Sequence, residues 1–120
     1  MPMIQEVLQE TNLTLNNMDL FAVSKGPGSF TGIRIGISTI KAFSDALSIP
    51  ALGITSLEGL AYNVDTDGLI AVLLDAKNNN VYYGLFRKQG DTYTPIGSFL
   101  AEPITTILPL LTSFSEKIIF

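Results

Sequence analysis

A glycine-punctuated loop between a strand and a long helix is the feature that most restricts how this chain can fold. Residues 26–36 read Gly-Pro-Gly-Ser-Phe-Thr-Gly-Ile-Arg-Ile-Gly. Leu20–Val23, just before this loop, is apolar throughout and predicts a short buried parallel strand. Thr31–Leu47, which follows, has the spacing of a helix. The pattern therefore predicts an α/β fold in which this loop is a strand-to-helix turn.

The loop itself is a candidate anion site. Free backbone N–H groups and the positive end of the dipole at a helix start can hold an anion, and glycines allow a close approach. The sequence is not a Walker loop, because no Gly-Lys-Ser/Thr follows, and its third glycine falls one place late for a dinucleotide fingerprint. Alternatively, Ser29 or Thr31 only caps the helix. The candidate residues are Gly26, Gly28, Ser29, Thr31, Gly32 and Arg34.

The helix after the loop has more apolar surface than one sheet can cover, because only a narrow stripe of it is polar. Gly32 and Gly36 lie four residues apart and leave space where another backbone could approach. A first amphipathic helix, Met3–Glu10, has one apolar face. We expect both helices to bind a partner, although a helix sandwiched inside its own domain would show the same periodicity. The predicted interface residues are Met3, Ile4, Val7, Leu8, Gly32, Ile33, Gly36, Ile37 and Ile40.

The remaining pattern predicts two lobes, residues 1–64 and 65–120. The first lobe alternates helices with two short strands, Leu20–Val23 and Ala51–Ile54, which is typical of a parallel sheet. Thr55–Glu58 has the spacing of a capping box. The second lobe predicts an antiparallel meander followed by a helix, which Pro109 would kink or stop early. Its expected elements are strands Leu69–Leu74, Val81–Arg87 and Thr92–Phe99, a helix from Pro103 to about Leu111, and a strand beginning at Lys117.

The composition excludes several kinds of chemistry. The chain has no Cys, His or Trp, so it has no thiol nucleophile, Cys/His zinc site or Ser-His-Asp triad, and we expect no catalytic or metal-binding residues. Asp75, after an expected strand, is a lone candidate carboxylate, but a turn role fits it better.

A net charge of −4 argues against direct nucleic-acid binding. No apolar run is long enough to span a membrane and no signal peptide is evident, so we expect a cytoplasmic protein.

The glycine loop and the residues after it resemble the TsaB (YeaZ) family of tRNA threonylcarbamoyladenosine biosynthesis proteins, formerly described as M22-like glycoproteases. The resemblance rests on residues 26–36, continues through Gly53–Glu58, and returns at Asp75-Ala76 and Val81-Tyr82. It implies an ASKHA fold (actin/Hsp70-like, ribonuclease H-like) of two related lobes. It also implies strands before residue 1 and chain beyond Phe120, so we expect the fold to be truncated at both ends.

The resemblance further implies a non-catalytic role. TsaB is understood as a scaffold that activates its larger homologue TsaD, which carries the metal and transfers threonylcarbamoyl, while the ATPase TsaE joins the assembly. The docking helices would be Met3–Glu10 and Thr31–Leu47, which pair with TsaD or, in isolation, with a second TsaB. ATP or ADP and metal are expected through the partners. The alternative is a nucleotide-binding ASKHA enzyme that holds phosphate at Gly26–Gly32; a peptidase is supported only by the old family name.

Overall fold

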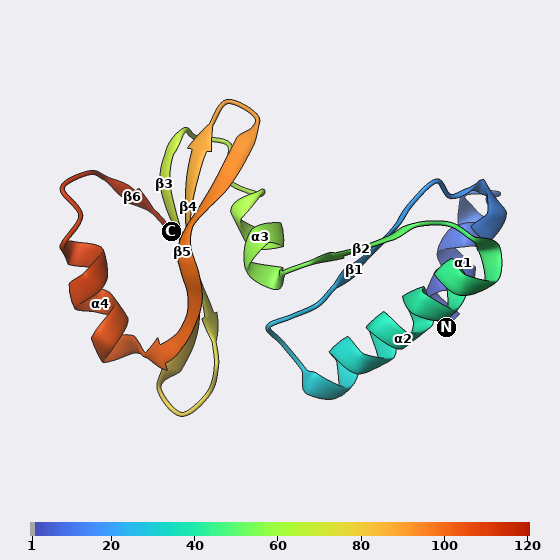
Figure 1. Ribbon diagram of the computed structural model, residues 1–120, viewed down its shortest axis with the longest axis horizontal. Helices are drawn as coiled ribbons and strands as arrows, with labels where there is room; N and C mark the ends of the chain where they lie inside the picture. Colours follow the sequence, from blue (N-terminus) through green and yellow to red (C-terminus); the bar gives the residue numbers. More distant parts are fainter. Residues whose placement is uncertain (1) are drawn as a thin grey trace. The chain divides into compact units, whose positions relative to one another are not determined.

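The computed structural model describes residues 2–120, which form four α-helices, one short 3-10 helix and six strands (Figure 1). The chain divides into two compact units. Unit 1 comprises the residues up to Lys25 together with Phe30–Ile54, and unit 2 comprises Gly26–Ser29 and Thr55–Phe120. The elements are α1 (Pro2–Glu10), η1 (Leu15–Asn17), β1 (Phe21–Ser24), α2 (Phe30–Leu47), β2 (Ala51–Ile54), α3 (Ser56–Ala61), β3 (Gly68–Asp75), β4 (Asn80–Gln89), β5 (Thr92–Pro103), α4 (Ile104–Thr112) and β6 (Ile118–Ile119).

Unit 1 is a two-stranded parallel sheet with α2 packed on one face. β1 and β2 pair from Phe21↔Ala51 to Ser24↔Ile54, which confirms the expected parallel pairing. The ring centroids of Phe43 and Phe21 are 6.0 Å apart. The expectation that Leu20–Val23 is a buried strand is wrong, because the strand starts at Phe21 and its alternate residues are exposed. Among the described residues of unit 1, Phe21 alone is a buried apolar residue, since two strands with one covering helix cannot enclose a core.

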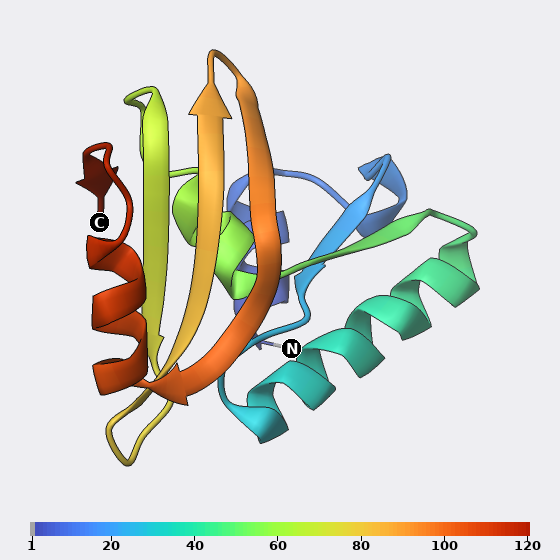
Figure 2. The same cartoon turned by 60° about the vertical axis from the view of Figure 1, so that its left-hand side comes forward.

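Unit 2 has a four-stranded sheet in the order β5-β4-β3-β6 (Figure 2). The β3–β4 and β4–β5 pairs are antiparallel, which confirms the predicted meander, and β6 is parallel to β3. One apolar core lies on each face of this sheet. The α4-side core contains Leu69, Ala71, Tyr83, Leu85, Ile107 and Leu111. The α3-side core contains Leu57, Ala61, Ile70, Val72 and Phe86.

The short helix α3 belongs to unit 2. Its predicted capping box is present: the Glu58 N–H donates to Thr55 Oγ1 at 3.0 Å, and the Thr55 N–H donates to Glu58 Oε2 at 2.8 Å. Leu57 and Ala61 lie one helical turn apart on α3, and both side chains belong to the α3-side core. One boundary between the units falls at Ile54/Thr55, because β3 and β4 cover the apolar face of α3. The division into lobes at residue 64 stays a prediction.

Helix α4 differs from its prediction at one point. The helix runs from Ile104 to Thr112, close to the predicted end at Leu111, so of the two effects expected of Pro109, a kink or an early stop, the early stop does not occur. Proline at this position costs one backbone hydrogen bond. Burial of Ile107 and Leu111 against the sheet offsets that loss.

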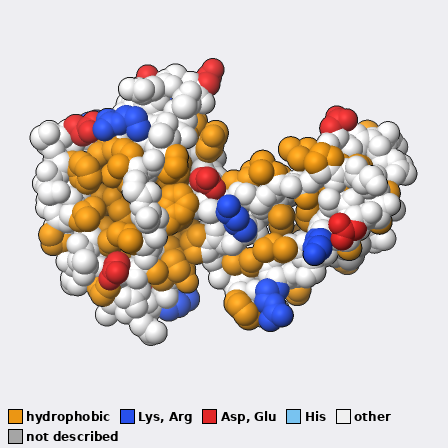
Figure 3. Space-filling model, viewed as in Figure 1, with side chains coloured by type: hydrophobic (Ala, Val, Ile, Leu, Met, Phe, Trp, Pro, Cys, Tyr) orange, Lys and Arg blue, Asp and Glu red, His pale blue; other side chains and the backbone are white. Residues whose placement is uncertain are grey.

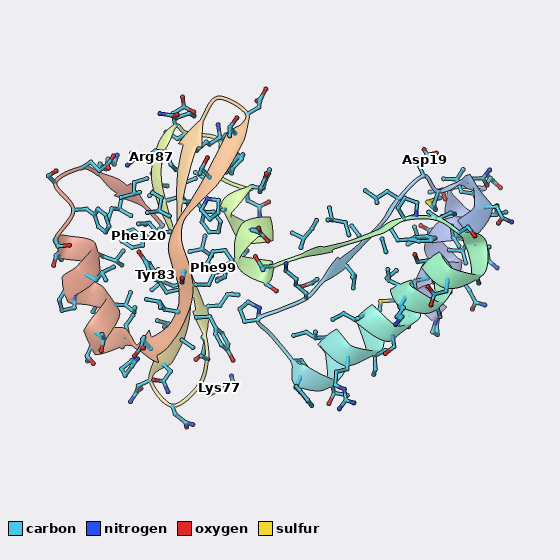
Figure 4. All side chains as sticks on the ribbon, viewed as in Figure 1. Asp19, Lys77, Tyr83, Arg87, Phe99 and Phe120 are labelled. Carbon is cyan, nitrogen blue, oxygen red and sulfur yellow. The ribbon has the colours of Figure 1, made fainter. Side chains whose placement is uncertain are left out.

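The Tyr83 hydroxyl is an internal polar group whose removal should stabilise the chain. The side chain lies on the α4 side of the sheet (Figure 4), and within residues 2–120 its buried Oη has no hydrogen-bond partner. Burial also raises the pKa of this phenol. Tyr83→Phe is expected to raise the free energy of unfolding by about 1 kcal/mol, since it removes an unpaired buried donor. Urea denaturation checks this, and a lower unfolding midpoint would show that the hydroxyl is bonded.

Candidate functional site

The first two helices carry uncovered apolar surface. α1 has 9 residues and α2 has 18, and no residue of either helix is buried. On α1, Met3 is 78% exposed and Val7 is 58% exposed, while Ile37 on α2 is 38% exposed. Figure 3 shows apolar side chains at the surface of both units. We call Met3, Ile4, Val7 and Leu8 of α1 with Ile33, Ile37 and Ile40 of α2 the helical surface.

An apolar cavity of about 320 Å³ opens within unit 1 beside the helical surface. It takes in five of the nine predicted interface residues and no charged side chain. Four of the lining residues were not predicted from the sequence. Two of them, Leu15 and Met18, are apolar residues three positions apart on either side of Asn16-Asn17, and this spacing could have indicated them. The lining residues are Met3, Ile4, Val7, Leu8, Leu15, Met18, Phe21, Ile40 and Phe43.

The two glycines of α2 lie in different surroundings. A Cβ atom at Gly36 would lie 3.5 Å from Val23 Cγ2, so Gly36 faces β1 of its own unit. The space that the sequence assigned to a partner's backbone at Gly36 is thus filled by Val23. Gly32 is exposed in the first turn of α2. Of the predicted pair, therefore, only Gly32 lies on open surface.

The glycine loop is folded against the start of α3. The Ser56 N–H donates to the Gly26 carbonyl oxygen at 2.9 Å, and Gly26 is buried. Its φ of 92° lies in the region that only glycine adopts readily, and the peptide bond to Pro27 is cis. The φ angle therefore requires glycine at position 26.

The predicted anion-binding residues are divided between the two units. Gly26, Gly28 and Ser29 fall in unit 2, whereas Thr31, Gly32 and Arg34 fall in unit 1. The Arg34 guanidinium carbon lies 5.2 Å from the Phe30 ring centroid, so this cation stacks on its own helix. α2 starts at Phe30, one residue earlier than predicted, which leaves Ser29 just before the helix. Anion binding by this loop stays a prediction.

Asp75 lies at the end of β3 and is engaged by the turn that follows. The Lys77 N–H donates to Oδ1 at 2.8 Å and Lys77 Nζ donates to Oδ2 at 3.3 Å. These hydrogen bonds, the backbone bond first, lower the pKa of the carboxyl group. Lys77 stands at the hairpin tip (Figure 4), where residues 77–79 all have positive φ. This geometry favours the turn interpretation of Asp75.

A second cavity lies beside Asp75 within unit 2. It measures about 340 Å³, and Asp75 is the one charged residue in its lining, which is Pro27, Gly28, Ser56, Leu60, Leu74, Asp75 and Tyr82.

Throughout residues 2–120, no three side chains of the His, Cys, Asp or Glu type are grouped so that they could hold a metal ion. Of the helices in the described part of the chain, none has the length and apolar character needed to cross a membrane.

Comparisons with known proteins agree with this fold. A family model described as TsaD, tRNA N6-adenosine threonylcarbamoyltransferase, matches residues 1–109. The tRNA threonylcarbamoyladenosine biosynthesis protein TsaB of Bacillus subtilis is 39% identical over 88 residues, which cover 72% of this chain and 38% of that protein. TsaB of Buchnera aphidicola is 41% identical over 87 residues, covering 70% of this chain and 41% of that protein. This chain thus spans less than half the length of these curated relatives.

A solved structure extends the likeness to the arrangement of the elements. YeaZ from Pseudomonas aeruginosa matches with a TM-score of 0.74 and 31% identity, covering 85% of this chain and 49% of that one. The α/β fold class of ASKHA type, expected from the resemblance, is confirmed by this match together with the family model. Loop, fold and relatives agree, and the chain belongs to the family that this model describes, among its TsaB (YeaZ) proteins.

Proposed function

We propose that this chain is a non-catalytic subunit in the formation of tRNA threonylcarbamoyladenosine, where it binds and activates a TsaD-type homologue through α1 and α2. The observation that carries the proposal is that neither helix buries a single residue within unit 1. The names of the relatives supply the pathway. We also propose a TsaE-type ATPase as a further partner, and self-association of the chain when it is alone. The proposed location is the cytoplasm.

The chemistry of the helical surface suits another helix. Met3 and Val7, like Ile33 and Ile37, are four residues apart, which is the spacing of anchors that lie in an apolar groove. The 320 Å³ cavity beside them offers room for an inserted apolar side chain, as the centre of a stable interface requires. A stable pairing buries about 800 Å² on each partner. Two helices of 9 and 18 residues are long enough to supply that area.

The non-catalytic part of the proposal rests on residue chemistry. The chain lacks His and Cys, the side chains that most often act as bases and nucleophiles near neutral pH. The Asp75 carboxylate, the candidate acidic group of the chain, accepts hydrogen bonds from Lys77 in a turn. We therefore assign the transfer chemistry to the partner. Activation would then result from a change in the partner's conformation when it binds α1 and α2.

Reconstitution tests the proposal. The TsaD-type homologue of the same organism is supplied with tRNA and a threonylcarbamoyl donor, with and without this chain, and the modified nucleoside is measured by mass spectrometry. The chain is expected to raise the yield and to form no product alone. An unchanged yield would contradict activation. Product formed by the chain alone, together with ATP and Mg²⁺ binding in calorimetry, would favour the nucleotide-binding enzyme.

A further inference from the structure

A third cavity lies in unit 1, between α2 and the strands β1 and β2. It measures about 270 Å³. Most of its lining is apolar, but two of its side chains, Lys25 and Lys41, are cations and none is a carboxylate. Figure 3 shows cationic side chains beside apolar ones on this unit. We call this cavity the lysine pocket, and its lining residues are Val23, Lys25, Ile37, Ile40, Lys41, Ser44, Ala51, Leu52 and Gly53.

The two lysines of the pocket have no carboxylate partner among residues 2–120. The ion pairs of this part of the chain engage Lys77, Arg87 and Lys88, all in unit 2. Asp45 lies one helical turn after Lys41 and is not paired with it. Two like charges in one small pocket repel each other, and an anion between them relieves that repulsion. In a chain with a net charge of −4, the pocket is therefore a local site of positive charge.

The Lys25 side chain lies against the sheet. A Cβ atom at Gly53 would lie 3.3 Å from Lys25 Cδ, so the stem of the lysine crosses the space that this glycine leaves open. Gly53 has no positive φ, so the close approach of the lysine, and not the backbone, favours glycine at this position. The Lys25 N–H donates to the Ile54 carbonyl oxygen at 2.9 Å. The backbone and stem of Lys25 are thus held in place, while the residue stays exposed.

The pocket suits a carboxylate on a polypeptide better than a free phosphate. Phosphate sites are typically built from backbone N–H groups that converge at a helix start or a nest. The lysine pocket lies beside residues 37–44 of α2, away from the helix start, and the Ser44 hydroxyl already donates to the Ile49 carbonyl oxygen at 2.7 Å. Two flexible ammonium groups over an apolar floor remain. Such a site favours an acidic side chain whose apolar neighbours cover the floor.

We propose that the lysine pocket receives acidic side chains, Asp or Glu, of the TsaD-type homologue at the rim of the interface made by the helical surface. This inference rests on the proposed function, because the partner is the same. Ile37 and Ile40 belong both to the helical surface and to the pocket, so a partner that lies on α2 also reaches the lysines. An apolar centre with polar and charged groups at its rim is the usual arrangement of a protein interface.

The position of the lysines sets what they contribute. Charges at the rim of an interface act mainly on the association rate and on its salt dependence. The Debye length falls from about 10 Å at 0.1 M salt to about 3 Å at 1 M, so this contribution is lost at high salt. The apolar contact of the helical surface is not screened in this way. Binding should therefore have a salt-dependent part that Lys25 and Lys41 carry.

Three double variants test the inference. Lys25→Met with Lys41→Met keeps apolar stems and removes both charges, and Lys25→Glu with Lys41→Glu reverses them. The control, Lys77→Glu with Lys117→Glu, makes the same change in net charge on two exposed lysines of unit 2. Surface plasmon resonance measures binding of the TsaD-type homologue at about 50 mM and about 500 mM NaCl, and circular dichroism checks folding.

The expected results separate local charge from net charge. At low salt, the Met variant should associate about tenfold more slowly and the Glu variant about thirtyfold more slowly or worse, with the control within about threefold of the unmodified chain. At high salt, the Met variant should come within about twofold of the unmodified chain. In addition, a carbodiimide joins a lysine amine to a carboxylate that it contacts. Mass spectrometry of the treated complex should find Lys25 or Lys41 joined to Asp or Glu of the homologue.

The outcomes that contradict the inference are distinct from those that contradict the proposed function. Association of both lysine variants at the unmodified rate, or cross-links from other lysines alone, would overturn the inference and leave the proposed function standing. A loss in the control equal to that in the Glu variant would assign the effect to net charge and would also overturn the inference. Absence of any binding by the unmodified chain would overturn both.

Discussion

The double substitution Val7→Asp and Ile37→Asp is expected to weaken binding of the TsaD-type homologue by at least about hundredfold. A hundredfold loss corresponds to about 2.8 kcal/mol, and burying an unpaired charge in an apolar interface costs at least that much. Both side chains are accessible in the chain alone, Val7 at 58% and Ile37 at 38%, so its own fold should change little. Calorimetry or surface plasmon resonance measures the dissociation constant, with circular dichroism as the check on folding.

The matched control places the same charge elsewhere. Leu108 of α4 is 51% exposed, and Leu108→Asp should leave the dissociation constant within about twofold of the unmodified chain, as a charge outside the interface does. Affinity that is unchanged in the double variant would remove the helical surface from the docking role. A loss in the Leu108 variant equal to that in the double variant would assign binding to unit 2.

The second large effect is expected in the core of unit 2. Phe86 is 1% exposed in the α3-side core and lies beside Phe99, with ring centroids 5.6 Å apart. Phe86→Ala should lower the free energy of unfolding of this unit by about 3–5 kcal/mol, through lost burial and a cavity. All four tyrosines of the chain lie in unit 2 and the chain has no tryptophan, so tyrosine fluorescence in urea reports this unit alone.

The matched control is Phe43→Ala in unit 1, where the ring is only half-buried. It should leave the tyrosine transition unchanged and lower the midpoint of the far-ultraviolet circular dichroism signal. This signal reports mainly unit 1, because α1 and α2 supply 9 and 18 helical residues, against 6 and 9 in α3 and α4. Coincident transitions shifted equally by both variants would show that the two units unfold as one.

Local signals in the sequence predicted several elements closely. Ala51–Ile54 was predicted with its observed bounds, because a short apolar run between breakers has few other solutions. The capping box from Thr55 to Glu58 was also predicted, since it depends on residues only three apart. The meander followed from turn residues between β-rich runs. In each case the chemistry that decides the structure lies within a few residues.

The expectations that differed depend on packing between residues distant in sequence. The sequence indicated a buried strand at Leu20–Val23, but burial needs a cover on both faces, which β1 does not have in unit 1. Periodicity placed Gly36 on a face of α2 but could not show that Val23 occupies the space beside it. Helical periodicity also could not show that α3 packs on β3. Of the candidate site, periodicity supplied the helical surface, whereas Phe21 and Phe43 appeared as its lining only in three dimensions.

The uncovered faces of α1 and α2 are proposed to bind a homologous subunit, and amide hydrogen exchange tests this most directly. Exchange of this chain is measured alone and with a saturating amount of the TsaD-type homologue. We predict slower exchange across residues 2–10 and 30–47 in the complex, with residues 80–103 unchanged. Unchanged exchange in both helices, or protection confined to α4 and β5, would contradict the proposal.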